Sequence, residues 1–270
     1  MGPATWRAAS AVQENAFLVL WVLSSKLLRP NHLRNWTRDL LYYPAAPDRR
    51  FRNEIVAQSI RSILPTGGKV LDVGSGASGL ERCLNRPEFR VTNLDLTASR
   101  LERFFGLAKG KVVGEALHLP FKTDSFDAVA AVDMIEHTMR ADRAKIIKEL
   151  ARVSRMHVIL HTPVESTDGR FGGRSDDEWF RRWFHLHFGI DDGNTLEHLR
   201  FGEPTLDELL ESLPGAQIEP SQPSQLWRAQ LQKSRTPLVG IAIGSGLDLE
   251  RSGGLGNPPY HAALVHWMKH

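Results

Sequence analysis

The chain has 270 residues, of which 41% are apolar and 24% charged, a balance that is ordinary for one large folded domain with additions. A single cysteine, Cys83, excludes an internal disulfide and a cysteine-cluster metal site. The net charge is only +3, but residues 1–52 carry eight lysines or arginines against three acids. We therefore expect the basic character to belong to the N-terminal arm and not to the rest of the chain.

That arm, residues 1–48, precedes the predicted core and contains eight consecutive apolar residues, 16–23. A membrane-spanning helix needs about 20 apolar residues, so we expect that this run does not cross a bilayer. It also lacks the basic leader and the cleavage site of a signal peptide. Two interpretations stay open. Residues 1–45 form either a helix that caps the substrate site or an interfacial helix that places Trp21 and Trp36 at lipid headgroups.

After a predicted helix over residues 49–63, a short apolar strand over residues 70–73 leads into a turn that contains Gly74, Ser75 and Gly76. Glycine adopts the backbone angles that a tight strand-to-helix turn needs, and its missing side chain lets a ligand lie against the backbone. We expect a helix to begin near Gly79 and to continue through residues 80–84.

Three further segments follow this turn at regular intervals. A second strand over residues 91–95 ends on Asp95, and an acid at this place in a nucleotide-binding unit accepts hydrogen bonds from ribose hydroxyls. A third segment runs over residues 112–121. A fourth strand covers residues 128–132 and ends at Asp133. A crossover helix over residues 98–108 is expected between the second and third segments.

The rest of the chain continues the alternation of helices and strands, with one interruption. A helix over 143–153 is followed by a strand over 158–161 and, later, by a Thr205-capped helix, a strand over 216–219, a helix over 225–244 broken at Pro237 and a last strand over 260–268. The pattern predicts an α/β fold with a mostly parallel sheet and helices on both faces. Residues 163–203 interrupt it and form a lid-like insertion at the ligand-binding edge.

The insertion concentrates aromatic side chains. Five of them fall within ten residues: Trp179, Phe180, Trp183, Phe184 and Phe188. We interpret this cluster as packing within the lid, as an aromatic wall for a ligand, or as both.

Four signals together give the chain a resemblance to a known family. They are Asp72-Val73-Gly74-Ser75-Gly76, the acid Asp95, Glu115-Ala116 followed by Leu119-Pro120-Phe121, and Ser125-Phe126-Asp127 leading to Glu136-His137. With these motifs, residues 55–213 resemble a class I S-adenosylmethionine (SAM) methyltransferase of the small-molecule, ubiquinone-biosynthesis-like type. Two departures are mild: Ser78 stands where the family has a third glycine, and Glu115 stands where it has aspartate.

The resemblance implies a Rossmann-like, doubly wound sheet of seven strands over residues 49–270, with an antiparallel last strand. It also implies S-adenosyl-L-methionine as the cofactor. The residues expected to bind it are Asp72, Gly74, Ser75, Gly76, Asp95, Leu96, Glu115, Ala116 and Asp133. A nicotinamide dinucleotide is the rival ligand, because Gly74, Gly76 and Gly79 have its glycine spacing, but the Leu-Pro-Phe and Ser-Phe-Asp segments do not belong to that class.

The acceptor side carries weaker signals. His137, His161 and His198 are candidates for a catalytic base, since imidazole titrates near neutral pH and all three are expected at the carboxyl edge of the sheet. The competing interpretation gives each a structural role, as in a hydrogen-bonded Glu136-His137 pair. The chain contains no His-Glu-x-x-His or comparable spacing, so the sequence predicts no metal site.

We therefore expect a SAM-dependent methyltransferase that acts on a small molecule, a lipid or a lipid-linked sugar, with oxygen as the preferred acceptor atom. The alternatives are an RNA methyltransferase and a non-catalytic SAM-fold binding protein. No nucleic-acid partner is expected, because Asn257-Pro258-Pro259-Tyr260 lies before the last strand and not after the fourth. The predicted location is cytoplasmic, with peripheral membrane contact through residues 1–45 if the arm binds lipid.

Overall fold

The structure is a computed structural model that describes residues 47–76, 80–97, 110–234 and 257–269. Almost all of the predicted N-terminal arm and the predicted crossover helix over residues 98–108 lie outside the described residues. Among the described helices, none has the length and apolarity that crossing a membrane requires.

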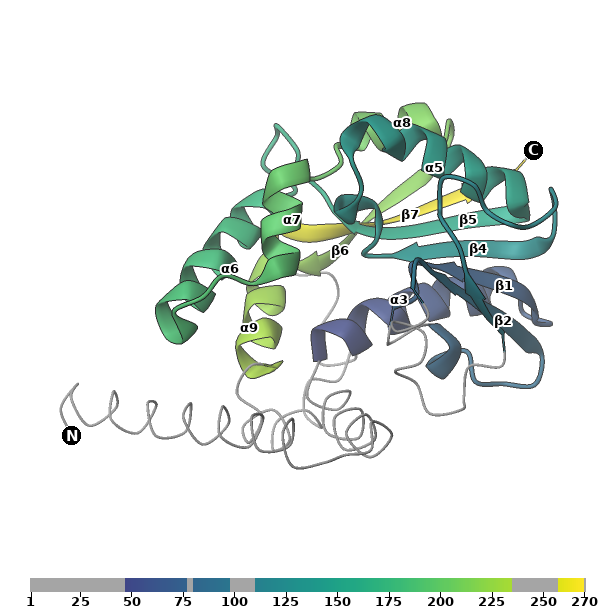
Figure 1. Ribbon diagram of the computed structural model, residues 1–270, viewed down its shortest axis with the longest axis horizontal. Coiled ribbons are helices and arrows are strands. Elements are labelled where there is room, and N and C mark those ends of the chain that lie inside the picture. Colours follow the sequence, from purple (N-terminus) through teal and green to yellow (C-terminus); the bar gives the residue numbers. More distant parts are fainter. Residues whose placement is uncertain (1–46, 77–79, 98–109, 235–256, 270) are drawn as a thin grey trace.

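The described residues contain one seven-stranded sheet with the strand order β3-β2-β1-β4-β5-β7-β6 (Figure 1). Strands β1 to β5 are mutually parallel, whereas β7 is antiparallel to both of its neighbours. The bounds are β1 Gly68–Val73, β2 Phe89–Asp95, β3 Lys111–Val113, β4 Phe126–Val132, β5 Ser154–Pro163, β6 Gln217–Pro223 and β7 Tyr260–Met268. This arrangement confirms the predicted doubly wound sheet with an antiparallel last strand.

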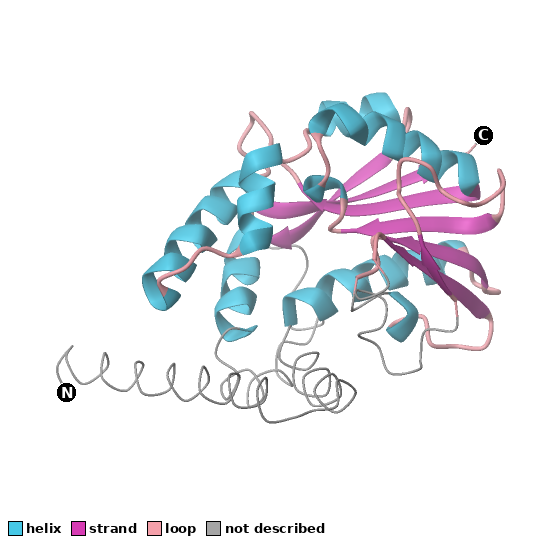
Figure 2. Cartoon of the chain, viewed as in Figure 1, coloured by secondary structure: helices cyan, strands magenta, loops and turns pink. Residues whose placement is uncertain are grey.

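Helices cover both faces of the sheet, also as predicted (Figure 2). Helix α3 lies on one face, and helices α5 and α8 lie on the other. The alternation of side chains along β1 explains the two layers, since Val70 packs with α3 while Leu71 and Val73 pack with α5. The helix bounds are α3 Pro47–Ile63, α5 Arg140–Val153, α6 Gly173–Phe188, α7 Gly193–Phe201, α8 Leu206–Ser212 and α9 Ser224–Ser234.

The prediction of a helix over Leu80–Leu84 is wrong. The chain forms only a single 3₁₀ turn, η1 (Leu80–Arg82), and then proceeds through turns to β2. Pro87 gives the physical reason, because a proline disfavours helical angles at the residue before it and cannot donate a backbone hydrogen bond.

The interrupting segment contains helices α6 and α7. Gly189, with φ of 69°, ends α6, and the Asp192 side chain accepts a hydrogen bond from the Thr195 amide to begin α7. The buried Asp176 carboxylate on α6 accepts a hydrogen bond from Arg228 of α9 at 2.7 Å and lies 3.3 Å from His261 of β7. These contacts fix α6 against the sheet and α9.

The aromatic residues of α6 form a packed cluster with α9. Phe180 and Phe184 are buried with Trp227 and Leu231. The remaining members pack against this group and are Trp179, Trp183 and Phe188. Packing between α6 and α9 therefore accounts for the most buried of these aromatic side chains.

Candidate active site

The glycine turn after β1 is shaped by two residues with positive φ, Gly74 at 72° and Gly76 at 53°. A side chain at Gly74 would also collide with Met134, because a Cβ there would lie 2.3 Å from the Met134 Cγ atom. The turn is held to the end of β2, since the Gly74 and Ser75 amides donate to the Leu94 carbonyl at 2.8 and 3.1 Å. Only glycine fits this turn at position 74 without strain and steric clash.

Two buried carboxylates hold the turn from inside. Asp72 accepts a hydrogen bond from the Leu80 amide at 2.7 Å, and Asp95 accepts one from the Gly76 amide at 2.8 Å. Burial raises the pKa of Asp72 to about 7, against the lowering effect of the Leu80 amide, and the nearby Asp95 carboxylate adds to the rise. Asp72 and Asp95, two of the four acids predicted as cofactor ligands, therefore lie together at the carboxyl end of β1 and β2.

The adenine-side residues lie next to the same edge. The Gly114 amide donates to the Asp95 carbonyl at 3.0 Å, which places Glu115 and Ala116 directly after the β2–β3 pairing. Glu115 is exposed, and Leu96 is 57% exposed. The predicted nucleoside-binding residues thus follow one another along the edge, with exposed side chains where a ligand can approach.

The residues of this edge fit the methionine and ribose parts of SAM. Within the described part of the chain, the buried Ser75 hydroxyl has no hydrogen-bond partner, and the nearest atom to a Cβ at Gly76 would be the Gly74 carbonyl oxygen at 3.9 Å. An unpartnered hydroxyl, open backbone and a carboxylate at the tip of β2 match a ligand that carries ammonium, carboxylate and ribose groups.

Asp133 does not stand free at the tip of β4 but forms part of a buried polar chain. It adopts a positive φ of 45° and pairs with the Arg52 guanidinium of α3. Its other oxygen lies 2.6 Å from His161 Nδ1, and His161 Nε2 lies 3.0 Å from the Ser221 hydroxyl. Burial alone would raise the pKa of Asp133, but Arg52 and His161 hold it well below its usual range.

His161 is fully buried, with both ring nitrogens in hydrogen bonds to side chains. This environment makes His161 the link between β4 and β6. Of the three histidines predicted as candidate bases, it is therefore the one most restricted in its access to a ligand.

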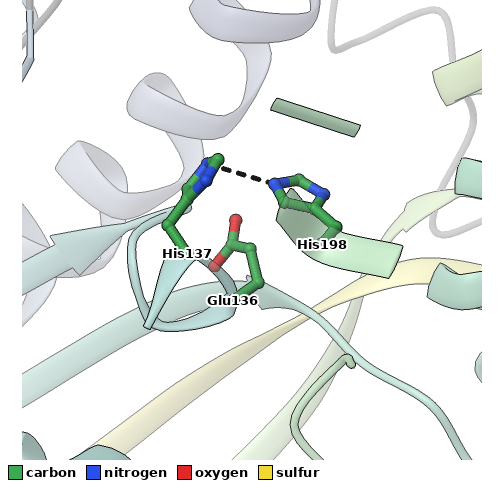
Figure 3. Close-up of side chains that lie close together, drawn as sticks. All are labelled: Glu136, His137 and His198. Atoms are coloured by element: carbon green, nitrogen blue, oxygen red, sulfur yellow. Dashed lines mark hydrogen bonds between the residues drawn. The ribbon is translucent and has the colours of Figure 1, made fainter. Parts of the chain in front are cut away.

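His137 and His198, by contrast, lie together. His137 belongs to the 3₁₀ turn η2 (Ile135–His137) after β4, and His198 belongs to α7; their Nε2 atoms are 3.1 Å apart (Figure 3). The remaining nitrogens each face a carboxylate, His137 Nδ1 at 3.0 Å from Glu197 and His198 Nδ1 at 2.8 Å from Asp177. Burial and the neighbouring His198 lower the pKa of His137 to about 4, so its imidazole is neutral at pH 7.

Three buried acids surround this pair. Glu136 is fully buried and accepts a hydrogen bond from Thr162 at 3.0 Å. Burial raises the pKa of Asp177 to about 6, and burial together with the Asp177 carboxylate raises the pKa of Glu203 to about 8. Asp177 and Glu203 could not be predicted from the sequence, because single acids within an aromatic helix and a loop carry no recognisable spacing.

Arg143 of α5 joins the two segments that carry the histidines. Its buried guanidinium donates to the carbonyl of Thr138, directly after η2, at 3.3 Å and to the carbonyl of Gly202, directly after α7. A fixed cation between two loop ends holds His137 and His198 at a defined separation.

Several known proteins are similar to this chain in sequence. Residues 71–160 match the family model described as a methyltransferase domain. The chain is 30% identical to demethylmenaquinone methyltransferase of Thermotoga maritima over 54% of this chain and 65% of that protein. It is 36% identical to 2-methyl-6-phytyl-1,4-hydroquinone methyltransferase of Synechocystis over 36% of this chain and 32% of that protein. The chain thus spans less than two thirds of the length of either relative.

Solved structures show the same fold at low identity. Magnesium protoporphyrin IX methyltransferase (ChlM) from Synechocystis, determined with bound S-adenosylhomocysteine (SAH), matches with a TM-score of 0.51 and 14% identity over 83% of this chain and 86% of that chain. The [4+2]-cyclase SpnF matches with a TM-score of 0.50 and 15% identity over 80% of each chain.

A fold that a methyltransferase shares with a cyclase does not by itself define the reaction. The match to the family model covers less of the chain than the structural matches, but it says more about the reaction. It runs from β1 into β5 and includes the glycine turn, Asp95 and the Glu136-His137 pair. Residues 71–160 therefore resemble a methyltransferase domain, and the chain has the fold of the solved methyltransferase structures.

Proposed function

We propose that the chain binds SAM at the carboxyl edge of β1 and β2 and transfers its methyl group to an oxygen atom of a small-molecule, lipid or lipid-linked sugar acceptor. One observation carries the proposal: the glycine turn lies against the segment that bears the buried Glu136 and the half-buried His137. Gly74 touches Met134, and Glu136 and His137 follow two and three residues later. Donor and acceptor groups would meet at one edge of the sheet.

The residues around the turn would hold the cofactor, which supplies a methyl group on a positively charged sulfur when it is bound. The backbone at Gly74 and Gly76 and the Ser75 hydroxyl would bind its methionine end. Asp95 would accept hydrogen bonds from the ribose, and Glu115 with Ala116 would lie along the adenine. Asp72 would act indirectly, because its carboxylate keeps the turn closed onto Leu80.

The protein's task in methyl transfer is alignment, together with removal of a proton from a hydroxyl acceptor. The His137–His198 pair with Glu136, Asp177 and Glu203 offers neutral imidazole and several carboxyl groups for that task. His161 and Asp133 would instead fix the end of β4, since each is already hydrogen-bonded within the fold.

The proposed class of acceptor rests on the names of two relatives. One is named for demethylmenaquinone and the other for a phytyl-substituted hydroquinone. We propose a ring or sugar hydroxyl on a lipid-like acceptor. Residues 1–45, with their apolar run and basic charge, would bring the protein to the surface of the membrane that contains it.

Transfer of a radiolabelled methyl group from SAM to a panel of hydroquinones, lipid extracts and lipid-linked sugars tests the reaction. We expect labelling of at least one hydroxylated acceptor by the wild type and none by Asp95→Ala. The matched control is Glu211→Ala, which removes an exposed acid of α8 and should leave labelling unchanged. Binding of SAH without labelling of any acceptor class would contradict the catalytic proposal.

The membrane part of the proposal has its own test. Co-sedimentation with anionic liposomes is expected for the full chain and not for a variant that lacks residues 1–45. Equal sedimentation of both proteins would contradict a role for this arm in membrane binding.

A further inference from the structure

The side chains of Glu136, His137 and His198 form a compact cluster of oxygen and nitrogen atoms that carry lone pairs. One oxygen or nitrogen of each lies within 4.8 Å of the others. Figure 3 shows the three side chains converging, with the two imidazoles on either side of the carboxylate. They come from η2 and α7, which are 60 residues apart in the sequence, so only the fold brings them together.

The hydrogen bonds around the imidazoles determine which nitrogen carries the proton. Asp177 lies 2.8 Å from His198 Nδ1, and Glu197 lies 3.0 Å from His137 Nδ1. A carboxylate next to Nδ1 holds the proton there, which leaves a lone pair on Nε2. Two neutral imidazoles with this tautomer would direct two lone pairs at each other, so the 3.1 Å contact becomes a hydrogen bond only when one Nε2 atom carries a proton.

Further lone pairs around the cluster lack donors. Glu136 Oε1 is buried without a hydrogen-bond partner among the described residues. The Glu203 carboxyl, which is only 7% exposed, interacts with Asp177, and this contact and burial raise its pKa. Because a buried acceptor without a donor costs about 1–3 kcal/mol, the Glu136 oxygen and the Nε2 lone pairs call for a positive group among them.

We infer that Glu136, His137 and His198 bind a divalent transition-metal ion, of the class of Zn²⁺, through one carboxylate oxygen and two Nε2 atoms. Imidazole nitrogens select such ions over Mg²⁺ and Ca²⁺, which prefer oxygen ligands. Two nitrogens bound at about 2.1 Å lie about 3.0–3.4 Å apart for ligand angles of about 90–109°, and the observed 3.1 Å falls in this range.

Asp177 and Glu197 then become the outer partners of the two ligands. A metal-bound histidine commonly donates its second N–H to a carboxylate, which orients the ring. Asp177 with Glu203 could alternatively join His198 in a second cluster, but the 2.8 Å contact already engages His198 Nδ1. The Nε2 side is therefore the side that is free for an ion.

Three protein ligands leave positions on the ion for a substrate oxygen. That role toward a hydroxyl acceptor rests on the proposed function, whereas binding of the ion does not. The chief competing explanation is a proton in place of the ion, which would make one imidazole a cation that donates to the other.

Titration of the untagged, metal-free full chain with Co²⁺, followed by visible absorption and then by displacement with Zn²⁺, tests the inference. We expect one Co²⁺ per chain in the wild type. Glu136→Gln, His137→Gln and His198→Gln should each weaken binding by about 100-fold or more, and Asp177→Asn by about 10–100-fold.

The chain supplies a matched control in His157 and His266, whose ring nitrogens also lie 3.1 Å apart in the sheet. His266→Gln removes one member of that pair and should leave Co²⁺ binding unchanged. Absence of Co²⁺ binding to the wild type, or an equal loss in His266→Gln and His198→Gln, would overturn the inference. Circular dichroism spectra that match the wild type exclude misfolding of the variants.

Titration of the same samples with SAH separates this inference from the proposed function. A chain that binds SAH but not Co²⁺ contradicts the metal site and leaves the proposed function intact. A chain that binds Co²⁺ at the three ligands but not SAH supports the metal site and contradicts the proposed function.

Discussion

The two halves of the candidate site differ in how the chain builds them. The cofactor half comes from the ends of β1 and β2 and the segment after β3, which follow each other within about 45 residues. The acceptor half combines η2 after β4 with α7 and the loop after it, 60 residues further along. The first half is made largely of backbone and two acids, whereas the second is made of side chains on η2 and on the inserted segment. Such a division lets the acceptor half change without loss of the cofactor half.

The largest expected effect is a loss of activity without a loss of cofactor binding, which would distinguish the two halves. His198→Gln removes an imidazole of the acceptor half, and we expect methyl transfer to fall by about 10²–10⁴-fold. The affinity for SAH should stay within about twofold of the wild type, because His198 lies outside the glycine turn. Kinetic assays and calorimetry on one preparation measure both quantities. A parallel loss of SAH binding would show that the halves are not separable.

Gly74→Ala attacks the cofactor half. The new Cβ would lie 2.3 Å from Met134 Cγ at a residue with φ of 72°, so we expect a loss of about 2–5 kcal/mol in the free energy of unfolding together with loss of SAH binding. Urea denaturation measures the stability. Gly189→Ala is the matched control, since its φ is 69° but its Cβ would meet no atom within 4 Å. It should cost only about 1–2 kcal/mol; equal losses would contradict the steric argument.

Asp133 lies where the two halves meet, and Asp133→Asn tests the ion pair that holds it. Leaving the Arg52 guanidinium without its charge partner should cost about 3 kcal/mol. Since Arg52 and His161 depress the pKa of Asp133 in the folded state, its stabilisation is present above the unfolded pKa of about 3.9 and is lost as the pH falls further.

Urea midpoints measured between pH 6 and pH 3 provide the comparison. The wild type should lose more stability than Asp133→Asn over this acid range. A variant that follows the same pH profile as the wild type would contradict the proposed source of the low pKa.

The smallest expected effect concerns the end of the acceptor half. Thr205 begins α8 with a capping box, in which its hydroxyl and the Glu208 carboxylate each accept a backbone hydrogen bond. Thr205→Ala should cost about 1 kcal/mol in thermal or urea unfolding. Thr205→Ser keeps the hydroxyl and should restore most of that loss.

The same division explains what could be predicted from the sequence. Strand ends of a parallel sheet meet at one edge, so Gly74 and Asp95 could be placed at one edge from the sequence, and the resemblance to a known family added Glu115. Boundaries were less accurate: β6 runs over Gln217–Pro223 where four residues were expected, and the helix predicted after the glycine turn shortens to η1. The length of β6 is determined by its pairing with β7, and the shortness of η1 reflects Pro87. Local apolar patterns indicate neither.

The acceptor half could be predicted only in part. Glu136 and His137 are adjacent in the sequence and suggested a pair, and His198 was one of several candidate histidines. Nothing in their spacing showed that α7 brings His198 to His137, because long-range contacts determine that distance. The roles of Asp177 and Glu203 likewise depend on burial, which no local pattern reveals.

Calorimetric titration of the full chain with SAH, in parallel with Asp95→Ala and His198→Gln, tests the central claim most directly. The account predicts saturable binding at one site per wild-type chain, loss of that binding in Asp95→Ala and retention in His198→Gln. Absence of binding to the wild type, or unchanged binding to Asp95→Ala, would contradict the assignment of the cofactor site.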